Sequence, residues 1–298
     1  MELWEIKVEV PAAQAEATEL ALLESGCDGW SILEDAVGKR AWIIGIFQGE
    51  LEAETRWSEL ESALPAKPLG GCAVRRLPDS DWKNSYRDHF RAWTFGRLHW
   101  VPVWERETFQ LPPGHSVLWL DPGMAFGTGN HETTRLCIER LVEFEESVAG
   151  GRAPVEVSVV DAGCGSGILA LSASLLGFDD VSGFDNDPEA VRVSLENAAL
   201  NGLSGRVRFS VAGLPEGFEG RQCGVVLANI QADVLVRHAR ALALAVAPGG
   251  LLAMSGILAV EVDAVLAAFA AHTPGWTAST RTLGEWSDVS LRRGPAAS

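Results

Sequence analysis

The sequence predicts an α/β protein in which a doubly wound, mostly parallel sheet follows a small α+β unit. From about residue 113 onward, strand-like and helix-like segments alternate, as they do in proteins built from βαβ units. The run Val155–Val160 ends in Asp161, and a turn with three glycines then leads into an apolar helix. Such a turn, placed between the first strand and the first helix, is suited to holding a nucleotide-like ligand.

Residues 1–78 predict a ferredoxin-like domain with the element order β-α-β-β-α-β. The alternation of apolar and polar residues over Trp4–Val10 marks a half-buried strand. The other expected strands lie at 29–33, 41–46 and 72–77, and the expected helices lie at 12–25 and 55–64.

Residues 79–112 are expected to form a linker rich in aromatic side chains. Tyr86, Phe90 and Trp93 fall at helical spacing, which favours an amphipathic linker helix packed on one or both domains. A short strand at 98–102 is expected to follow this helix.

The main domain is expected over residues 113–298. Its parallel strands are predicted at 157–161, 181–185, 207–211, 223–228 and 251–255, and its helices at 168–176, 188–201, 233–246 and 261–272. Residues 276–283 and 286–291 are expected to close the sheet as an antiparallel pair. A ligand is expected beyond the carboxyl ends of the strands, where the strand order reverses.

Composition restricts the classes of partner. The formal net charge of −16 argues against binding to a nucleic-acid backbone. Charges near the first residue predict no secretion signal, and the lack of a long apolar run predicts no membrane partner. The five cysteines lie far apart without a C-x-x-C pair, which predicts neither a metal site nor a disulfide framework and favours a reducing cytoplasm. We also expect a monomer.

The negative charge is concentrated at the start of the chain. Residues 1–66 hold 14 acidic and 4 basic side chains. Two interpretations remain open at this point. The acids either form an ordinary solvated face or form a surface that attracts a basic partner.

The glycine turn favours one class of cofactor. A dinucleotide fingerprint reads G-x-G-x-x-G, whereas here the third glycine comes one residue early and the string is Gly163-x-Gly165-x-Gly167. The shorter spacing after an acid-ended strand is the form seen in methyltransferases that depend on S-adenosylmethionine. Cys164, inside the turn, is interpreted as a small turn residue rather than a nucleophile.

Two further strands end in residues suited to this cofactor. Asp185 ends the second strand and is expected to accept hydrogen bonds from ribose hydroxyls, whereas Asp187, followed by Pro188, is expected to cap the next helix. Asn229 ends the fourth strand, where amino-methyltransferases commonly carry an asparagine. Its oxygen would face the methionine end of the cofactor or the substrate nitrogen, although asparagine also suits a plain strand-to-loop turn.

The segment 121–134 is not part of the generic fold. It reads Asp-Pro-Gly-Met-Ala-Phe-Gly-Thr-Gly-Asn-His-Glu-Thr-Thr, and its three glycines within seven residues predict a loop that approaches a ligand closely. Thr133 and Thr134 are expected to begin a helix. His131 has no second metal ligand at a useful spacing, so we interpret it as part of the loop.

Taken in order, these strings resemble the ribosomal protein L11 methyltransferase family (PrmA-like). The likeness also includes Asn197-Ala-Ala-Leu-Asn201-Gly and Ser255-Gly-Ile-Leu, and with the N-terminal unit it spans nearly the whole chain. The resemblance implies a Rossmann-like class I methyltransferase domain that uses S-adenosylmethionine. It also implies methylation of lysine side chains and/or the N-terminal α-amine of L11, with residues 1–78 recognising that substrate.

The resemblance assigns site residues as well. Thr134, Gly163, Asp185 and Asn229 are carried over as cofactor residues; Gly165, Gly167 and Phe126 are added from the same motifs, and Asn229 is the expected catalytic residue. Asn186 and the longer run 143–154 depart from the family pattern. They leave room for a related protein lysine methyltransferase with another protein substrate.

The sequence disfavours two other functional classes. A regulatory module that binds the cofactor without catalysis would need a lost Asn229 or a degraded segment 121–134, which we call the threonine-rich loop, and both are intact. Small-molecule N- or O-methyltransferases often lack a separate acidic α+β domain, so residues 1–66 favour a macromolecular substrate.

Overall fold

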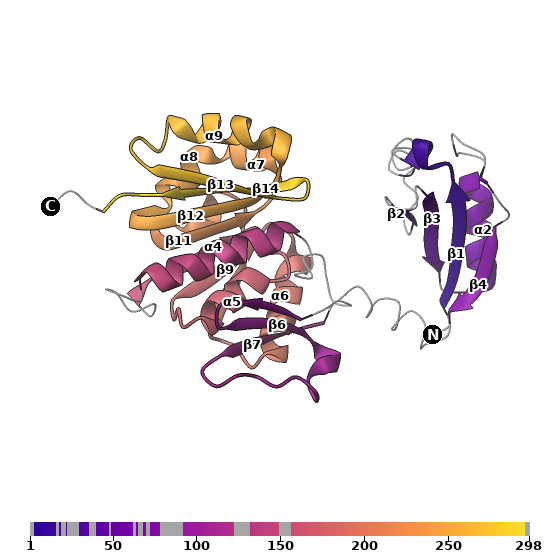
Figure 1. Ribbon diagram of the computed structural model, residues 1–298, viewed down its shortest axis with the longest axis horizontal. Coiled ribbons are helices and arrows are strands. Elements are labelled where there is room, and N and C mark those ends of the chain that lie inside the picture. The colour runs from indigo at the N-terminus through magenta and orange to yellow at the C-terminus, as the bar shows by residue number, and fades with distance from the viewer. Residues whose placement is uncertain are drawn as a thin grey trace. The chain divides into compact units, whose positions relative to one another are not determined.

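The chain consists of two compact units, residues 1–90 and 91–298, which we call the N-terminal and the C-terminal unit. The structure is a computed structural model that describes residues 3–15, 18, 22, 30–35, 40–47, 49–61, 64, 68–69, 72–77, 92–121, 132–148 and 156–295. Figure 1 shows the elements of each unit. Within the described ranges, no helix has both the length and the apolar character that a membrane crossing requires.

The N-terminal unit contains a four-stranded antiparallel sheet in the order β2-β3-β1-β4. The strands are β1 (Leu3–Val10), β2 (Trp30–Asp35), β3 (Arg40–Phe47) and β4 (Ala73–Leu77), and α2 spans Glu50–Glu61. This is the ferredoxin-like strand order, which confirms the predicted type of domain. Of the expected helix over 12–25, the structure describes a 3-10 turn at Ala12–Gln14 and helical backbone at Ala15, Thr18 and Leu22, and the rest lies outside the described residues.

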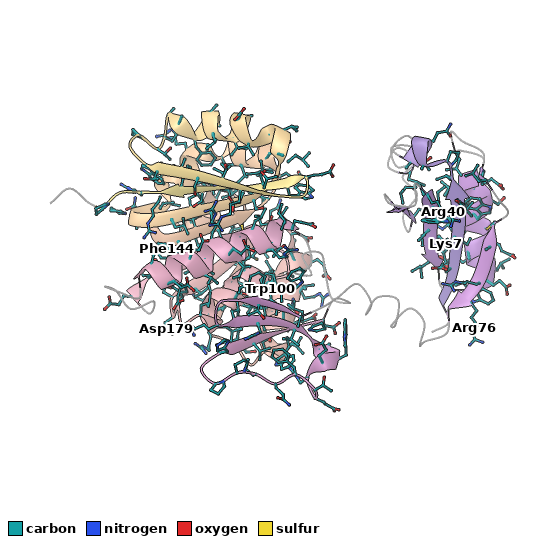
Figure 2. All side chains as sticks on the ribbon, in the orientation of Figure 1. Lys7, Arg40, Arg76, Trp100, Phe144 and Asp179 are labelled. Carbon is teal, nitrogen blue, oxygen red and sulfur yellow. The ribbon has the colours of Figure 1, made fainter. Side chains whose placement is uncertain are left out.

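Strand alternation separates the two faces of this small sheet. Ile6 and Val8 of β1 and Ile43 of β3 are buried in the core, and α2 adds Ala53, Trp57 and Leu60 at helical spacing. The intervening positions of β1 carry the charges of Glu5, Lys7 and Glu9, whereas those of β3 carry one charge, on Arg40. Lys7 and Arg40, both labelled in Figure 2, place their cationic groups 4.7 and 4.8 Å from the ring centroid of Trp42.

The C-terminal unit is built on a seven-stranded sheet in the order β10-β9-β8-β11-β12-β14-β13. The strands are β8 (Val159–Ala162), β9 (Val181–Asp185), β10 (Val207–Val211), β11 (Cys223–Asn229), β12 (Val246–Leu258), β13 (Thr277–Leu283) and β14 (Trp286–Arg292). The first five are parallel, and β14 pairs antiparallel with both β12 and β13. The predicted doubly wound sheet and its antiparallel closing pair are confirmed, and the order reverses between β8 and β11.

Helices cover both faces of this sheet, as Figure 1 shows. One buried cluster holds residues of α4 (Glu132–Val148), α5 (Ile168–Leu175) and α6 (Pro188–Leu200). A second cluster holds residues of α7 (Ala232–Arg237), α8 (Ala239–Leu244) and α9 (Val262–Ala270). The carboxyl ends of the parallel strands therefore lie between two helical layers.

Two predicted elements need correction. The expected helix at 233–246 is divided at His238 into α7 and α8. The strand expected at 251–255 is longer, because β12 already begins at Val246. Backbone pairing explains the extension: Cys223 N–H donates to Ala245 O at 2.7 Å, and Gly249 N–H donates to Gly294 O at 2.9 Å, so residues around Pro248 stay within the sheet.

A three-stranded sheet at the start of the C-terminal unit was only partly predicted. It consists of β5 (Trp93–Phe95), β6 (Leu98–Pro102) and β7 (Ser116–Leu120). The short strand expected at 98–102 is confirmed, whereas Trp93 lies in a strand and not in a helix. Trp100, labelled in Figure 2, is fully buried, and its Nε1–H donates to Ser172 Oγ of α5 at 2.9 Å. The unit thus begins ahead of residue 113, where we expected it to start.

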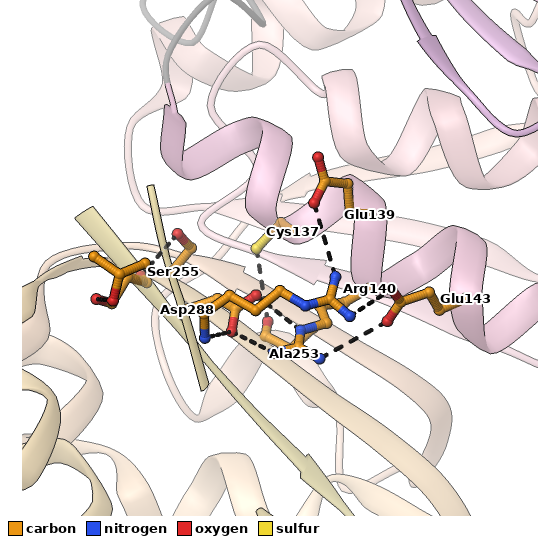
Figure 3. A network of polar contacts seen from close by, with 10 residues as sticks. Cys137, Glu139, Arg140, Glu143, Ala253, Ser255 and Asp288 are labelled. Carbon is orange, nitrogen blue, oxygen red and sulfur yellow. Dashed lines mark hydrogen bonds and ion pairs between the residues drawn. The ribbon is translucent and has the colours of Figure 1, made fainter. Parts of the chain in front are cut away.

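A buried ion pair anchors α4 to β14, as Figure 3 shows. Arg140 Nε–H and Nη2–H donate to the two carboxylate oxygens of Asp288 at 2.8 and 2.7 Å. The Arg281 backbone N–H donates to the same carboxylate at 3.0 Å. The Arg140 and Asp288 side chains are 7% and 1% exposed. We call this pair the α4 anchor, because it fixes the helix that carries Thr134.

Candidate functional site

A cavity of about 1190 Å³ opens at the carboxyl ends of the parallel strands, where the strand order reverses. The structure brings five of the predicted site residues together in its wall: Thr134, Gly163, Gly165, Asp185 and Asn229. Gly167 does not line the cavity and instead precedes the first residue of α5. Phe126 lies outside the described residues.

Three left-handed glycines shape the turn after β8. Gly163, Gly165 and Gly167 have φ values of 76°, 52° and 76°, which side chains with a Cβ rarely adopt. The Gly163 and Cys164 N–H groups both donate to Phe184 O of β9, at 2.8 and 3.0 Å. The turn is therefore held against the next strand with its backbone facing the cavity.

Two glycines allow the turn after β11 to approach this site closely. A Cβ on Gly163 would lie 2.4 Å from Ile230 Cγ2, and a Cβ on Gly256 would lie 2.5 Å from Ile230 O. Ile230 is thus packed between the glycine turn and β12. This contact fixes the position of Asn229, the residue immediately before it.

Polar residues of α6 support the glycine turn from behind. Ser194 Oγ–H donates to Gly165 O at 2.8 Å, and Asn197 Nδ2–H donates to Ser166 O at 2.9 Å. One turn further, Asn201 bonds to both backbone groups of Trp119 in β7. Sequence reasoning missed these supports. The available signal was the spacing of three polar residues along one face of a helix.

The two aspartates after β9 have different contacts. Asp185 accepts hydrogen bonds from Gly165 N–H at 2.9 Å and from Asp187 N–H at 3.0 Å, one on each oxygen. Each carboxylate oxygen keeps a lone pair for a ligand hydroxyl. Asp187 accepts from Glu189 N–H at 2.8 Å and precedes Pro188, so its predicted role as the N-cap of α6 is confirmed.

The side chains of Asn229 and Thr134, which both line the cavity, are joined by a hydrogen bond. Asn229 ends β11, and its Nδ2–H donates to Thr134 Oγ1 at 3.2 Å. Thr134 is 2% exposed and lies in the first turn of α4. The amide nitrogen is engaged by Thr134, and the carbonyl oxygen of Asn229 can still accept a hydrogen bond.

Asp161 was recognised in the sequence as the acid that ends the first strand, but it was not predicted as a residue of the site. The side chain is 1% exposed and lines the cavity at the end of β8. Its Oδ2 accepts a hydrogen bond from Ala170 N–H at 3.2 Å, whereas its Oδ1 has no hydrogen-bond partner among the described residues. Burial is the main cause that raises the pKa of Asp161 to about 7.

Comparison with known proteins now decides the family. The family model described as ribosomal protein L11 methyltransferase (PrmA) matches residues 2–294. The chain belongs to this family. A relative with the same name from Pseudomonas aeruginosa is 38% identical over 282 residues, covering 90% of this chain and 91% of the relative. Another from Azotobacter vinelandii is 39% identical over 280 residues, covering 89% and 91%.

A solved structure supports the fold. The crystal structure of a ribosomal protein L11 methylase from Lactobacillus delbrueckii subsp. bulgaricus superposes with a TM-score of 0.58 at 28% sequence identity. The match covers 69% of this chain and 100% of that chain. The C-terminal unit is a class I methyltransferase domain, and the family uses S-adenosylmethionine as methyl donor.

The described residues fit this cofactor. The glycine turn presents backbone where a Cβ would collide with Ile230, and Asp185 offers acceptors at the end of β9. The Oδ1 atom of Asp161 is an unsatisfied buried acceptor in the same wall. Hydroxyl groups and an ammonium group are the donors that such a set of acceptors suits.

Proposed function

We propose that this chain transfers methyl groups from S-adenosylmethionine to lysine side chains and/or the N-terminal α-amine of ribosomal protein L11. Membership of the family over residues 2–294 carries this proposal, because the match includes both units and not the methyltransferase domain alone. The predicted domain roles follow from it. The C-terminal unit performs the transfer, and the N-terminal domain, residues 1–78, recognises the protein.

The cofactor lies along the cavity wall described above. We assign Gly163, Gly165 and Asp185 to direct contact with it, together with Thr134 and Asn229. Gly167 acts through the turn, since its left-handed backbone lets α5 begin there. Phe126 completes the predicted set from the threonine-rich loop. When bound, the cofactor supplies a methyl group that is attached to a sulfonium sulfur. The sulfur part of the cofactor is the leaving group and becomes a neutral thioether.

The acceptor amine limits this reaction because it is almost fully protonated at neutral pH. A lysine with an ordinary pKa of about 10.4 is neutral in only about 0.04% of molecules at pH 7. A site that removes water from the ammonium group favours its neutral form. Positioning the lone pair in line with the methyl group then supplies most of the remaining acceleration. No covalent intermediate with the protein is needed.

Asn229 is the residue placed to orient the amine. Its amide is fixed by the bond to Thr134, and its carbonyl oxygen accepts an N–H of the amine, which points the lone pair away from Asn229. We expect Asn229→Ala to lower kcat about 100-fold, since misplacing a reacting group has an effect of this size. Initial rates with saturating cofactor measure this.

Binding of S-adenosylhomocysteine provides the control for this variant. Thr134→Val removes the hydroxyl that holds the Asn229 amide group but keeps the Asn229 oxygen. Its loss of kcat should therefore be smaller than that of Asn229→Ala. Both variants should still bind S-adenosylhomocysteine by calorimetry, more weakly than the unchanged chain, because the contacts of Gly163, Gly165 and Asp185 are kept. Full turnover by Asn229→Ala would contradict the orienting role.

The acidic surface of the N-terminal unit supports a cationic protein substrate. The outward positions of α2 carry Glu50, Glu52, Glu54, Glu59 and Glu61 but a single arginine, Arg56, and all six are exposed. Target lysines and an N-terminal amine are positively charged before transfer. The field of these acids therefore steers such a substrate toward the unit.

Labelled cofactor tests the proposed substrate. The full chain is incubated with methyl-labelled S-adenosylmethionine and either purified ribosomal protein L11 or a ribosome-free cell lysate. We expect label in L11, in fragments that contain lysines or the N-terminus, and none in L11 whose amines have been dimethylated chemically. Label confined to other lysate proteins favours a related protein lysine methyltransferase, and label in small molecules alone would refute a protein substrate.

We also propose the setting in which the enzyme works. A ribosomal protein substrate and cysteines without pairing motifs support a cytoplasmic location. The net charge of −16 supports an enzyme that meets L11 without binding nucleic acid itself. We infer a monomer, which sedimentation at several protein concentrations tests.

A further inference from the structure

An exposed apolar ridge follows the last residues of β12. It consists of residues 258–260, which end this strand and begin a 3-10 turn, and we call it the β12 ridge. Leu258 is 36% exposed, and Val260 is 88% exposed, the largest value among the large apolar residues that the structure describes. Covering such side chains with a partner removes apolar surface from water and is favourable.

Strand pairing connects the β12 ridge to the cavity. Leu258 is the register partner of Trp286 in β14, and Trp286 lines the cavity. Gly256, two residues before Leu258, lines it as well. The ridge therefore lies at the rim of the cavity, on the side that β12 and β14 form.

Hydrogen bonds fix the backbone of the ridge. Ala259 N–H donates to Glu285 O, in the turn between β13 and β14, at 2.9 Å. Leu258 N–H donates to Glu261 Oε2, also at 2.9 Å. The apolar side chains are thus presented to solvent from an ordered backbone. A surface that is already ordered loses less conformational entropy when a partner binds.

The charged side chains next to the ridge are acidic. Glu261 ends its 3-10 turn, and Glu285 is exposed on the neighbouring turn. Among the residues that the structure describes, neither carboxylate takes part in an ion pair. An arginine that lines the cavity, Arg237 of α7, is already paired with Asp233 at 3.0 Å. The ridge therefore combines apolar surface with uncompensated negative charge, which suits a partner that is both apolar and cationic.

Methyl transfer to a protein brings the substrate backbone to this rim. A lysine side chain has a stem of only four carbons, so the backbone of a lysine whose amine reaches the methyl group stays near the cavity mouth. An N-terminal α-amine has no stem and brings its backbone still closer. The residues that flank the target amine are therefore the part of the substrate that covers the rim.

We propose that the β12 ridge docks the segment of the protein substrate that flanks the target amine. Apolar side chains of this segment cover Val260 and Leu258, and its cations face Glu285 and Glu261. The inference rests on the proposed methylation of a protein. It adds a docking surface on the C-terminal unit to the recognition that we assign to residues 1–78.

Kinetics of the full chain with ribosomal protein L11 test the ridge. Val260→Ser removes apolar surface from a side chain that is almost fully exposed, so we expect this variant to fold. The KM for L11 should rise about ten-fold, the effect of one valine side chain that is no longer covered, while kcat at saturating L11 stays unchanged. Glu285→Lys should also raise the KM, because it places a cation against a cationic segment.

Leu244→Ser is the matched control. Leu244 is 60% exposed, but it ends α8 just before the first residue of β12, at the edge of the sheet opposite the cavity. This variant should keep the KM and kcat of the wild type. Calorimetric affinity for S-adenosylhomocysteine should be the same for all three variants and the wild type, because none of the three positions lines the cavity.

Photo-cross-linking tests the contact directly. Val260→p-benzoylphenylalanine is irradiated with L11 in the presence of S-adenosylhomocysteine, which occupies the cofactor site without transfer. We expect a cross-link to L11 within a few residues of a methylated position. The same side chain at position 244 should give none.

The results separate the ridge from the proposed substrate. With L11 labelled, a wild-type KM for Val260→Ser, or equal cross-linking from positions 244 and 260, would overturn the docking role. With other lysate proteins labelled instead, L11 fails as the substrate. The ridge is then supported if Val260→Ser labels those proteins more slowly than Leu244→Ser, and overturned if the rates are equal. Label in small molecules alone, or no label, would overturn both proposals.

Discussion

Replacing Asp288 by alanine is expected to lower the free energy of unfolding of the C-terminal unit by about 3–5 kcal/mol. The reason is that the positive charge of the buried Arg140 guanidinium group stays in the interior. Arg140 donates two hydrogen bonds to Asp288 from a position that is almost fully buried, and its other acidic neighbour, Glu143, lies 3.8 Å away with a side chain that is 48% exposed. Without Asp288 the guanidinium group is left in the interior without adequate compensation.

Scanning calorimetry measures this effect, with a matched aspartate as control. The transition of the C-terminal unit is identified by its upward shift with S-adenosylhomocysteine. Asp233→Ala breaks an exposed ion pair with Arg237 and should change stability by less than about 1 kcal/mol. The double variant Arg140→Met, Asp288→Leu should be more stable than Asp288→Ala. If Asp288→Ala and Asp233→Ala lowered the free energy of unfolding equally, the α4 anchor would contribute no more to stability than an exposed ion pair.

Replacing Gly163 by alanine should lower kcat about 100-fold, because it displaces the turn that carries Asn229. The added Cβ lies 2.4 Å from Ile230 Cγ2, which is close to the backbone of that residue and has little freedom to move. The backbone at φ 76° also costs about 1–2 kcal/mol for a residue with a Cβ. Activity assays and calorimetric binding of S-adenosylhomocysteine measure the two consequences.

Gly202 provides the control for Gly163. It has a φ of 67°, and a Cβ at this position would meet no atom within 4 Å. Gly202→Ala should therefore show the conformational cost of about 1–2 kcal/mol without the loss of kcat. If both variants kept full activity, the close packing of Ile230 against the glycine turn would not be what positions Asn229.

The sequence predicted those parts of the site that depend on local chemistry. Glycines in a left-handed turn, an aspartate that caps a helix and an asparagine at a strand end each act within a few residues of their position. Asp187 shows this well, since Ser/Thr/Asn/Asp before a proline is a local signal for a helix start. The strand order was also predictable, because alternating strands and helices permit few arrangements.

The sequence did not predict features that depend on distant contacts. Trp93 belongs to β5 because its backbone pairs with Trp100, and helical spacing in the sequence cannot anticipate that pairing. Burial raises the pKa of Asp161 to about 7, and this burial depends on the residues that pack around it and not on its residue type. The supports from Ser194 and Asn197 to the glycine turn join residues about 30 positions apart. Such effects follow from packing and not from local propensity.

The position of β14 has a consequence for how the enzyme matures during synthesis. The strand lies between β12 and β13 although it follows both in the chain, and it brings Asp288 to Arg140 of α4. A nascent chain that ends anywhere before residue 288 exposes an incomplete sheet and an arginine without its partner. Asp288 therefore becomes available to Arg140 only after every cofactor residue described above has been synthesised.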